Sequence, residues 1–293
     1  MKKTTIIIGE SASIEESICQ KYGFVVVPFK IDWPEMDSLE GNNIFEKMRD
    51  AEKKGIKTTP KTSQPSIGMF KKAFDEGIKE SDSIICITIS SGISGTYNSA
   101  LQAKKMLSEE DQKKIFILDS FNADASEGLL AIKAKELADE GKTGEEIFEI
   151  IKKVSPKVFL FGMLESPKWL EAGGRINHTL SVILSQMQKI GMRPILSVKD
   201  GIIKPANLKM QAKDTANALF KQVEGVIKKP LEEGAICRVA ISHADAKEEG
   251  DKLKKLFEEN YPQVKVAFIG QTSPVIGSHV GPGTLICCSI EEK

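Results

Sequence analysis

Short apolar runs alternate with segments of helical periodicity along the first half of the chain. Residues 4–8 and 84–89 are β-branched and free of charge, as expected for strands buried on both faces of a sheet. Helices are predicted after them, over residues 13–22, where Ser13 and Glu16 form a capping box, and over residues 96–106. This alternation continues to about residue 154 and predicts a three-layer α/β/α domain with a mostly parallel sheet.

The pattern changes after Ser155-Pro156, which is the predicted domain boundary. Asp200-Gly201 indicates a hairpin at residues 194–205, and a long helix is expected over 214–228. With the apolar runs at 158–161, 237–242, 264–269 and 284–290, these elements predict an α/β domain with a mixed sheet. We therefore expect an N-terminal domain at residues 1–155 and a C-terminal domain at residues 156–293.

Composition narrows the class of protein. The 293 residues suffice for two α/β domains, and the 41 Lys+Arg balance the 41 Asp+Glu, so no net field favours nucleic acid or an anionic membrane. The five cysteines form no CxxC pair and suit reduced thiols in a cytoplasmic core. No run approaches the ~20 apolar residues of a membrane span, and the first apolar run is too short for a signal peptide. We expect a cytoplasmic protein without stable membrane insertion.

The stretch at residues 87–100, ITISSGISGTYNSA, is where we expect a ligand to bind. A strand followed by a Ser/Gly turn and a helix directs backbone N–H groups and the positive end of the helix dipole toward one point. That arrangement suits an anion at the carboxyl edge of an α/β sheet. The same residue types are also typical of helix caps and tight turns, so this stretch alone leaves both interpretations open.

Two further polar clusters favour the binding interpretation. Residues 62–66, TSQPS, again place hydroxyl groups before a predicted helix. Residues 273–283 contain three glycines and two prolines, which predict a sharply turned loop with His279 in its middle. A lone histidine is more often structural than functional, but core packing explains a histidine in such a loop poorly.

Taken in order, these motifs resemble the DegV family over nearly the whole chain. The motifs that carry the resemblance are TSQPS at 62–66, SSGISGTY at 90–97, Asp119-Ser120, GGRI at 173–176, HAD at 243–245 and GSHVGPG at 277–283. The resemblance implies two α/β domains with one long-chain fatty acid buried between or within them. It also implies a role in the bacterial fatty acid kinase system, in which such a protein presents the fatty acid to a separate ATP-using kinase subunit.

The resemblance further implies which residues hold the ligand. The carboxylate contacts transfer to Thr62 and Ser94, with Ser63, Ser91 and the backbone at Gly92 as weaker candidates, and the loop histidine transfers to His279. Arg175, the arginine of GGRI, is a candidate contact for phosphate or for a partner. For this chain we accordingly expect no cofactor, no metal and no independent catalysis, with membrane contact only while lipid is exchanged.

The chemistry of these residues agrees with that role. Hydroxyl and backbone N–H donors orient a carboxylate while leaving one oxygen accessible to a phosphoryl donor. A buried C16 or C18 tail gains on the order of 10 kcal/mol before ordering costs. Candidate residues for lining the tail channel are Phe161, Met163, Leu164, Leu180, Ile183, Leu184, Met187 and Ile276. His279 either contacts the carboxylate or only holds its loop, and Arg175 pairs with phosphate or with a carboxylate of this chain.

Two observations qualify the resemblance. Many family members carry a basic motif after the hairpin, whereas residues 207–214 here contain no arginine. In addition, residues 92–95 fall one residue short of a G-x-S-x-G elbow, which makes a serine hydrolase with Ser94 as nucleophile, His279 as base and Asp119 as acid the alternative function. A phosphate-binding G-x-x-x-x-G-K-[ST] loop is missing, and the three separated histidines have no metal-ligand spacing.

Overall fold

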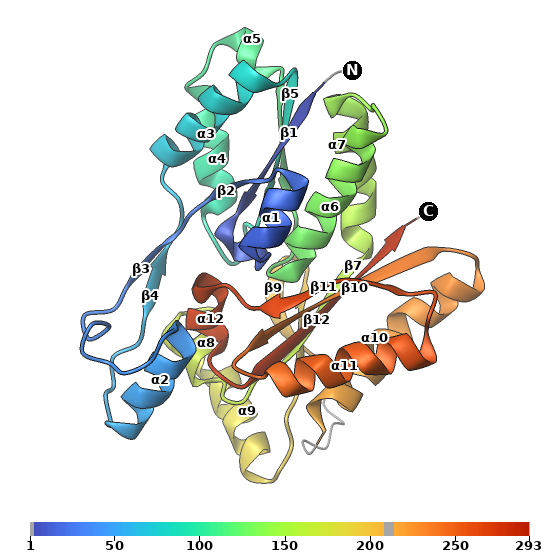
Figure 1. The fold of residues 1–293 in the computed structure, drawn as a ribbon. Coiled ribbons are helices and arrows are strands. Elements are labelled where there is room, and N and C mark those ends of the chain that lie inside the picture. The colour runs from blue at the N-terminus through green and yellow to red at the C-terminus, as the bar shows by residue number, and fades with distance from the viewer. Residues whose placement is uncertain (1–2, 208–213, 293) are drawn as a thin grey trace.

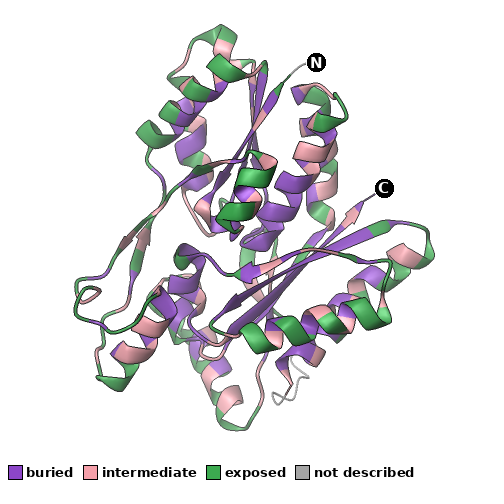
Figure 2. Ribbon diagram, viewed as in Figure 1, coloured by how far each residue is buried: buried purple, intermediate pink, exposed green. Residues whose placement is uncertain are grey.

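The computed structural model describes residues 3–207 and 214–292, which form two α/β domains (Figure 1). The N-terminal sheet has strand order β2-β1-β5-β6, and its strands are all parallel. They are β1 (Thr4–Gly9), β2 (Val25–Val27), β5 (Ser83–Thr88) and β6 (Ile115–Asp119). Burial of whole strands such as β5 reflects helices on both faces (Figure 2). The predicted three-layer domain with a parallel sheet is confirmed.

The helices of this domain cover the sheet in two layers. Phe70 of α3 and Ala100 of α4 pack on one face, and Leu129 of α6 and Ile147 of α7 pack on the other. The helical elements are η1 (Glu10–Ala12), α1 (Glu16–Tyr22), α3 (Ile67–Glu80), α4 (Thr96–Lys105), α5 (Glu109–Gln112), α6 (Ala125–Asp139) and α7 (Gly144–Val154). Thr143 and Glu146 form a capping box at the start of α7.

The C-terminal sheet has strand order β11-β10-β12-β7-β8-β9 and is mixed, as predicted. Its β10–β11 pair is parallel, and the other four pairs are antiparallel. The strands are β7 (Val158–Met163), β8 (Ile195–Lys199), β9 (Ile202–Asn207), β10 (Ile236–Ala244), β11 (Lys265–Gln271) and β12 (Thr284–Glu292). The helical elements are η2 (Ser155–Lys157), α8 (Lys168–Ala172), α9 (His178–Lys189), α10 (Thr215–Glu232), α11 (Lys247–Asn260) and α12 (Pro274–Val280).

The register of this sheet decides which side chains face the other domain. Leu160 of β7, Cys288 of β12 and Ala240 of β10 lie opposite one another, as do Gly162, Ile286 and Ser242. Residues of these two rows join the hydrophobic core of the N-terminal domain. The alternating positions, such as Phe161, Cys287 and Ile241, pack on α10 and α11.

Residues 30–63 form an arm that leaves the N-terminal domain and packs on the C-terminal one (Figure 1). The arm consists of the antiparallel pair β3 (Lys30–Asp32) and β4 (Lys61–Ser63) with α2 (Ile44–Lys53) between them. Phe45 of the arm clusters with Trp169, and Arg49 forms a bidentate ion pair with Glu165 at 2.5 and 2.6 Å. The arm belongs to the predicted N-terminal range, residues 1–155, yet it packs on residues of the C-terminal range. The domain division at residue 155 stays a prediction.

Two local predictions are wrong. Ser13 does not cap α1, because its backbone is left-handed (φ 50°) and its hydroxyl accepts a hydrogen bond from the Ser273 amide at 2.9 Å. Residues 274–280 form the helix α12 instead of a loop. Ser273 caps this helix, Pro274 occupies its first turn, and Gly281 with φ 76° ends it.

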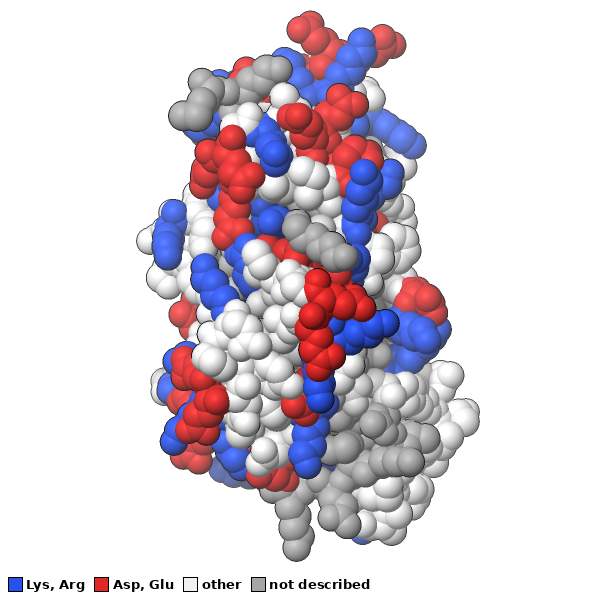
Figure 3. Space-filling model, turned by 90° about the vertical axis from the view of Figure 1, so that its right-hand side faces the viewer, with Lys and Arg blue, Asp and Glu red and all other residues white. Residues whose placement is uncertain are grey.

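Charge is mixed on the face of the molecule drawn in Figure 3. On the face drawn in Figure 3, basic and acidic side chains are intermingled, and neither sign forms a continuous field. Many charged side chains pair with a residue four positions away in the same helix, as Lys71 does with Asp75 in α3 and Lys247 with Asp251 in α11. The ligand chemistry must therefore be sought in a local site.

Candidate functional site

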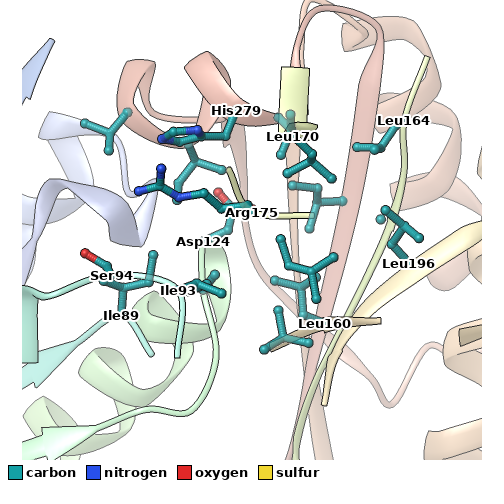
Figure 4. A pocket seen from close by; sticks show the side chains of 18 of the residues that line it. Ile89, Ile93, Ser94, Asp124, Leu160, Leu164, Leu170, Arg175, Leu196 and His279 are labelled. Carbon is teal, nitrogen blue, oxygen red and sulfur yellow. The ribbon is translucent and has the colours of Figure 1, made fainter. Parts of the chain in front are cut away.

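An apolar pocket lies between the two domains (Figure 4). In the N-terminal sheet, β1 has β2 on one side and β5 on the other, so the chain reverses its direction of winding beside β1 and β5. Ligands in open α/β sheets bind beyond the carboxyl ends of the strands at this point. Ile89 and Ile93, which follow β5, line the pocket there. The space between the lining atoms is about 750 Å³, its mouth included.

The walls come from both domains. The C-terminal sheet supplies Leu160, Ile286 and Leu196 from the face set by its register, and Gly162 leaves that face without a side chain. The other apolar lining residues are Phe29, Ile89, Ile93, Ala123, Leu164, Leu170, Val198, Ile203, Val275, Ile276 and Val280.

The structure separates the predicted channel residues into groups. Leu164 and Ile276 line the pocket. Phe161 and Met163 point to the opposite face of the sheet, toward α10, because side chains alternate along a strand. The remaining four lie on α9, where Leu180 and Leu184 pack behind Leu164, Met187 is half-buried and Ile183 is exposed.

One end of the pocket is polar, and a hydrogen bond between Thr62 and His279 lies there. Thr62 Oγ1 is 2.7 Å from His279 Nε2, which joins the arm strand β4 to α12. Gly173 packs against the other ring nitrogen, Nδ1, so closely that a Cβ at residue 173 would collide with it. The missing side chain at Gly173, the first glycine of GGRI, therefore leaves the space that the His279 ring occupies.

His279 is neutral at pH 7. Burial, with a smaller contribution from the positive charge of Arg175, lowers the pKa of His279 to about 4. Its Nδ1 is buried and has no hydrogen-bond partner in the part of the chain that the structure describes. An unpaired lone pair costs less than an unpaired N–H group, so we assign the proton to Nε2, which then donates to Thr62.

Ser94 stands on the N-terminal side of the same pocket, just before α4. Its Oγ lies 2.8 Å from the buried Thr96 Oγ1 and accepts a longer bond, 3.4 Å, from the Thr96 amide. If the Thr96 hydroxyl donates, the Ser94 hydroxyl hydrogen is free to point to a ligand. Thr62 and Ser94 thus each have a neighbouring side chain able to donate a hydrogen bond to the hydroxyl oxygen.

Arg175 supplies the positive charge of the pocket. Its guanidinium donates through Nη1 to the Gly173 carbonyl, and burial lowers the pKa of Arg175 without removing its charge at pH 7. Among the described residues no carboxylate forms an ion pair with Arg175. A half-buried cation in this state is suited to an anionic ligand.

The other predicted contacts lie outside this pocket. Ser63 is exposed in β4, and the Ser91 amide donates to the Asp119 carboxylate at 3.2 Å. The Gly92 amide donates to Ser90 Oγ, and Gly92 packs against the Gly201 turn of the β8–β9 hairpin. The N–H groups of Ser91 and Gly92 therefore form hydrogen bonds that stabilise the turn and its surroundings.

The hydrolase alternative requires contacts that differ from those seen. Ser94 bonds to Thr96, His279 to Thr62, and Asp119 to the amides of Ser91 and Phe121. Within residues 3–207 and 214–292, no hydrogen bond joins two of the three proposed triad members. This geometry does not resemble a nucleophile held by a base and an oriented acid.

Sequence reasoning missed Asp124, which also lines the pocket. Asp124 is fully buried, and its Oδ2 accepts a hydrogen bond from Ser242 of β10. Burial raises the pKa of Asp124, an effect that the neighbouring hydroxyls partly offset. A carboxylate in the segment before α6 looks like an ordinary helix cap, so the sequence contains no signal of its position.

Comparison with known proteins identifies the family. The family model described as uncharacterised protein, DegV family, matches residues 3–292. The chain belongs to the DegV family. It is 31% identical over 290 residues to a DegV domain-containing protein of Clostridium perfringens, covering 97% of this chain and 96% of that one.

Solved structures of DegV family proteins share the fold. A fatty-acid-binding DegV family protein from Thermus thermophilus has a TM-score of 0.83 at 22% identity, over 99% of this chain and 100% of that chain. The B3 protein of Streptococcus pneumoniae fatty acid kinase, loaded with linoleic acid, has a TM-score of 0.79 at 21% identity over the same shares. At these identities the likeness establishes the fold.

The described residues also bear on two other kinds of site, a membrane span and a metal centre. No described helix is both long and apolar enough to cross a bilayer. Within the described ranges, no group of three or more His, Cys, Asp or Glu side chains is arranged to hold a metal ion. Most of the segment without arginine, residues 208–213, lies outside the described residues.

Proposed function

We propose that this protein binds one long-chain fatty acid in the interdomain pocket, with the tail along the apolar walls and the carboxylate at the polar end. The observation that carries the proposal is the pocket itself, whose apolar lining ends at Thr62, Ser94, Arg175 and His279. DegV relatives of the same fold that bind fatty acids support it.

The hydrogen-bond network favours a carboxylate over a neutral head group. His279 donates to Thr62, so the Thr62 hydroxyl directs its own hydrogen to the ligand, and Ser94 backed by Thr96 does the same. Arg175 adds the compensating charge. In this proposal Ser63, Ser91 and Gly92 support the surrounding turns and have no direct contact with the ligand.

Presentation to a kinase is the next step of the proposal. We infer that the protein acts in the cytoplasm as a substrate-presenting subunit without catalysis of its own, and that a separate kinase subunit phosphorylates the held carboxylate. The name of the streptococcal neighbour supports such a partner. Exposed Val182, Ile183 and Ile190 at α9 offer an apolar surface for transient membrane contact during lipid exchange.

The test is native mass spectrometry of the purified protein, with extraction of whatever is bound and titration of the delipidated protein with oleate. We expect one fatty acid per chain. Thr62→Ala with Ser94→Ala should weaken oleate binding at least tenfold, because two hydrogen bonds to a charged group are lost. A delipidated protein that takes up neither oleate nor palmitate would overturn the proposal.

Arg175 provides a second, matched comparison. Arg175→Gln should weaken oleate binding about tenfold or more, since a charge-assisted contact is removed. Arg193→Gln, at an arginine that does not line the pocket, should bind oleate like the wild type. Equal affinities of the two variants would argue against Arg175 as a carboxylate contact.

A fluorophosphonate probe should leave Ser94 unmodified, whereas stoichiometric labelling would favour the hydrolase alternative.

A further inference from the structure

Two glycines of the motif at residues 277–283 make room for the packing of the arm. A Cβ at Gly277 would lie 2.4 Å from the ring of Phe45 in α2, far inside ordinary van der Waals contact. A Cβ at Gly281 would lie 2.0 Å from Trp169, which packs in the same hydrophobic cluster as Phe45. Side chains at these two positions would therefore occupy the space in which the arm meets the C-terminal domain.

Gly283 and the HAD motif hold the arm through a second set of contacts. A Cβ at Gly283 would overlap the carboxylate of Glu165, the group that forms the ion pair with Arg49 of α2. Ala244 of the HAD motif packs in the hydrophobic cluster of the arm, and Asp245 lies 3.8 Å from Arg49 Nε. The HAD motif, which does not line the pocket, thus contributes to holding the arm.

The helix α12 meets the arm at two points. Gly277 faces Phe45 of α2, and two residues later His279 forms the 2.7 Å hydrogen bond with Thr62 of β4. Figure 1 shows α12 beside α2 and the β3–β4 pair, and α12 contacts all three elements. Because α12 has only seven residues, a shift at its contact with α2 also changes its distance from β4.

Phe45 has little freedom to move. Its side chain is 1% exposed and packs among Trp33, Met48 and Trp169. The Asn43 side chain caps α2 and accepts a hydrogen bond from the Phe45 amide at 2.9 Å. A close-packed ring on a fixed backbone transmits a displacement to its neighbours instead of absorbing it.

We propose that Phe45 is a positioning residue for the carboxylate site, because its contact with Gly277 sets how closely α12 approaches the arm. That approach fixes the distance between Thr62 and His279. This inference rests on the proposed function and refines how its polar end is built. A methyl group at residue 277 requires a shift on the order of 1 Å, and a hydrogen bond of 2.7 Å is lost when its atoms separate by that much more.

The first test is a double-mutant cycle on oleate binding, measured by titration of the delipidated protein. Gly277→Ala should weaken oleate binding about tenfold, because the methyl group separates α12 from the arm and disturbs Thr62. In a Thr62→Ala background the same change should cost less than about twofold, since the contact that it disturbs is already absent. A general defect of the fold would weaken oleate binding by the same factor in both backgrounds.

The second test reverses the effect of the same substitution. Phe45→Leu shortens the buried side chain, so it loosens the contact and should weaken oleate binding severalfold. Adding Gly277→Ala should refill the space and restore oleate affinity to within about threefold of the wild type. Gly225→Ala is the matched control, because a Cβ at Gly225 in α10 meets no atom within 4 Å, and it should bind oleate like the wild type.

The outcomes are separable. A wild-type protein that takes up neither oleate nor palmitate would count against the proposed function. A folded Gly277→Ala protein with wild-type oleate affinity, or a loss that adds fully to that of Thr62→Ala, would overturn this inference alone. If Gly277→Ala does not fold, the pair with Phe45→Leu decides, and a further loss of affinity on adding Gly277→Ala to Phe45→Leu has the same meaning.

Discussion

The hydrogen bond between Thr62 and His279 joins residues 217 positions apart in the chain. Thr62 lies in strand β4 of the arm, and His279 lies in helix α12 of the C-terminal half of the chain. The bond therefore ties the arm to the C-terminal domain at the polar end of the pocket.

Acid should weaken the folded state through His279. With a pKa of about 4 in the fold and about 6.5 when unfolded, the unfolded chain binds the extra proton first as pH falls. Stability is then lost between pH 6.5 and 4, and this group alone lowers the free energy of unfolding by about 2 kcal/mol from pH 7 to pH 5. Urea unfolding of the delipidated protein measures it.

The control for this prediction is His279→Asn, which cannot take up the proton. Its free energy of unfolding should fall less between pH 7 and pH 5 than that of the wild type. Other titrating groups affect both proteins alike, so the difference between the two slopes belongs to residue 279. Identical slopes would mean that His279 titrates normally in the fold.

At the scale of residues, the family motifs predicted more of the pocket residues than reasoning from side-chain chemistry did. Thr62, Ser94, Arg175 and His279 are far apart in the sequence, and family resemblance named all four before the structure brought them to one pocket. Thr96 and Asp124 were missed because their roles depend on burial and on which neighbour they meet. The free N–H groups expected at Ser91 and Gly92 are used instead by Asp119 and Ser90.

At the scale of elements, long periodic segments were predictable, and elements that depend on tertiary pairing were not. The hairpin with Asp200-Gly201 and the capping box at Thr143 form as their local chemistry dictates. The three-residue strand β4 exists only because Thr62 pairs with Ile31 of β3. The helix α12 was hidden because glycine and proline usually indicate a loop, while Ser273 and Pro274 were starting it.

The strand β7 offers a test of the channel at this scale. Gly162 faces the pocket, and a Cβ there would meet Ile286 at 3.4 Å, an ordinary contact. Gly162→Val should therefore keep or slightly raise stability, since valine favours strands by up to ~1 kcal/mol, while its side chain fills the floor of the pocket. We expect oleate binding to weaken at least tenfold, measured by titration of the delipidated protein.

The matched control for Gly162 is Gly225→Ala in α10. A Cβ at Gly225 meets no atom within 4 Å, and this residue lies outside the pocket. It should bind oleate like the wild type. Unchanged oleate affinity in a folded Gly162→Val protein would mean that the tail takes another path.

At the scale of the whole molecule, the two domains share one core. Leu129 and Leu130 of α6 pack in the same hydrophobic cluster as Leu160, Ile286 and Cys288 of the C-terminal sheet. The pocket lies beside this shared core and takes its walls from both domains. The predicted division into two domains thus describes the sheets better than it describes the packing.

Arg238 holds this interface electrostatically. It donates to Glu136 of α6 at 2.5 and 2.6 Å and to Glu292 of β12 at 2.7 Å, and Glu292 is almost fully buried. Arg238→Met should lower the free energy of unfolding by about 3 kcal/mol, because it leaves buried negative charge without its main partner. Urea unfolding at pH 7 measures the loss.

Adding Glu292→Gln to Arg238→Met separates lost attraction from uncompensated charge. If unpaired charge dominates, the double variant should be more stable than Arg238→Met alone, even though a second polar contact has been changed. Lys133, 3.1 Å from Glu292, limits the size of this recovery because it continues to neutralise part of that charge. A loss below about 1 kcal/mol for Arg238→Met would indicate that apolar packing at Leu129 and Leu160 holds the domains together without help from this ion pair.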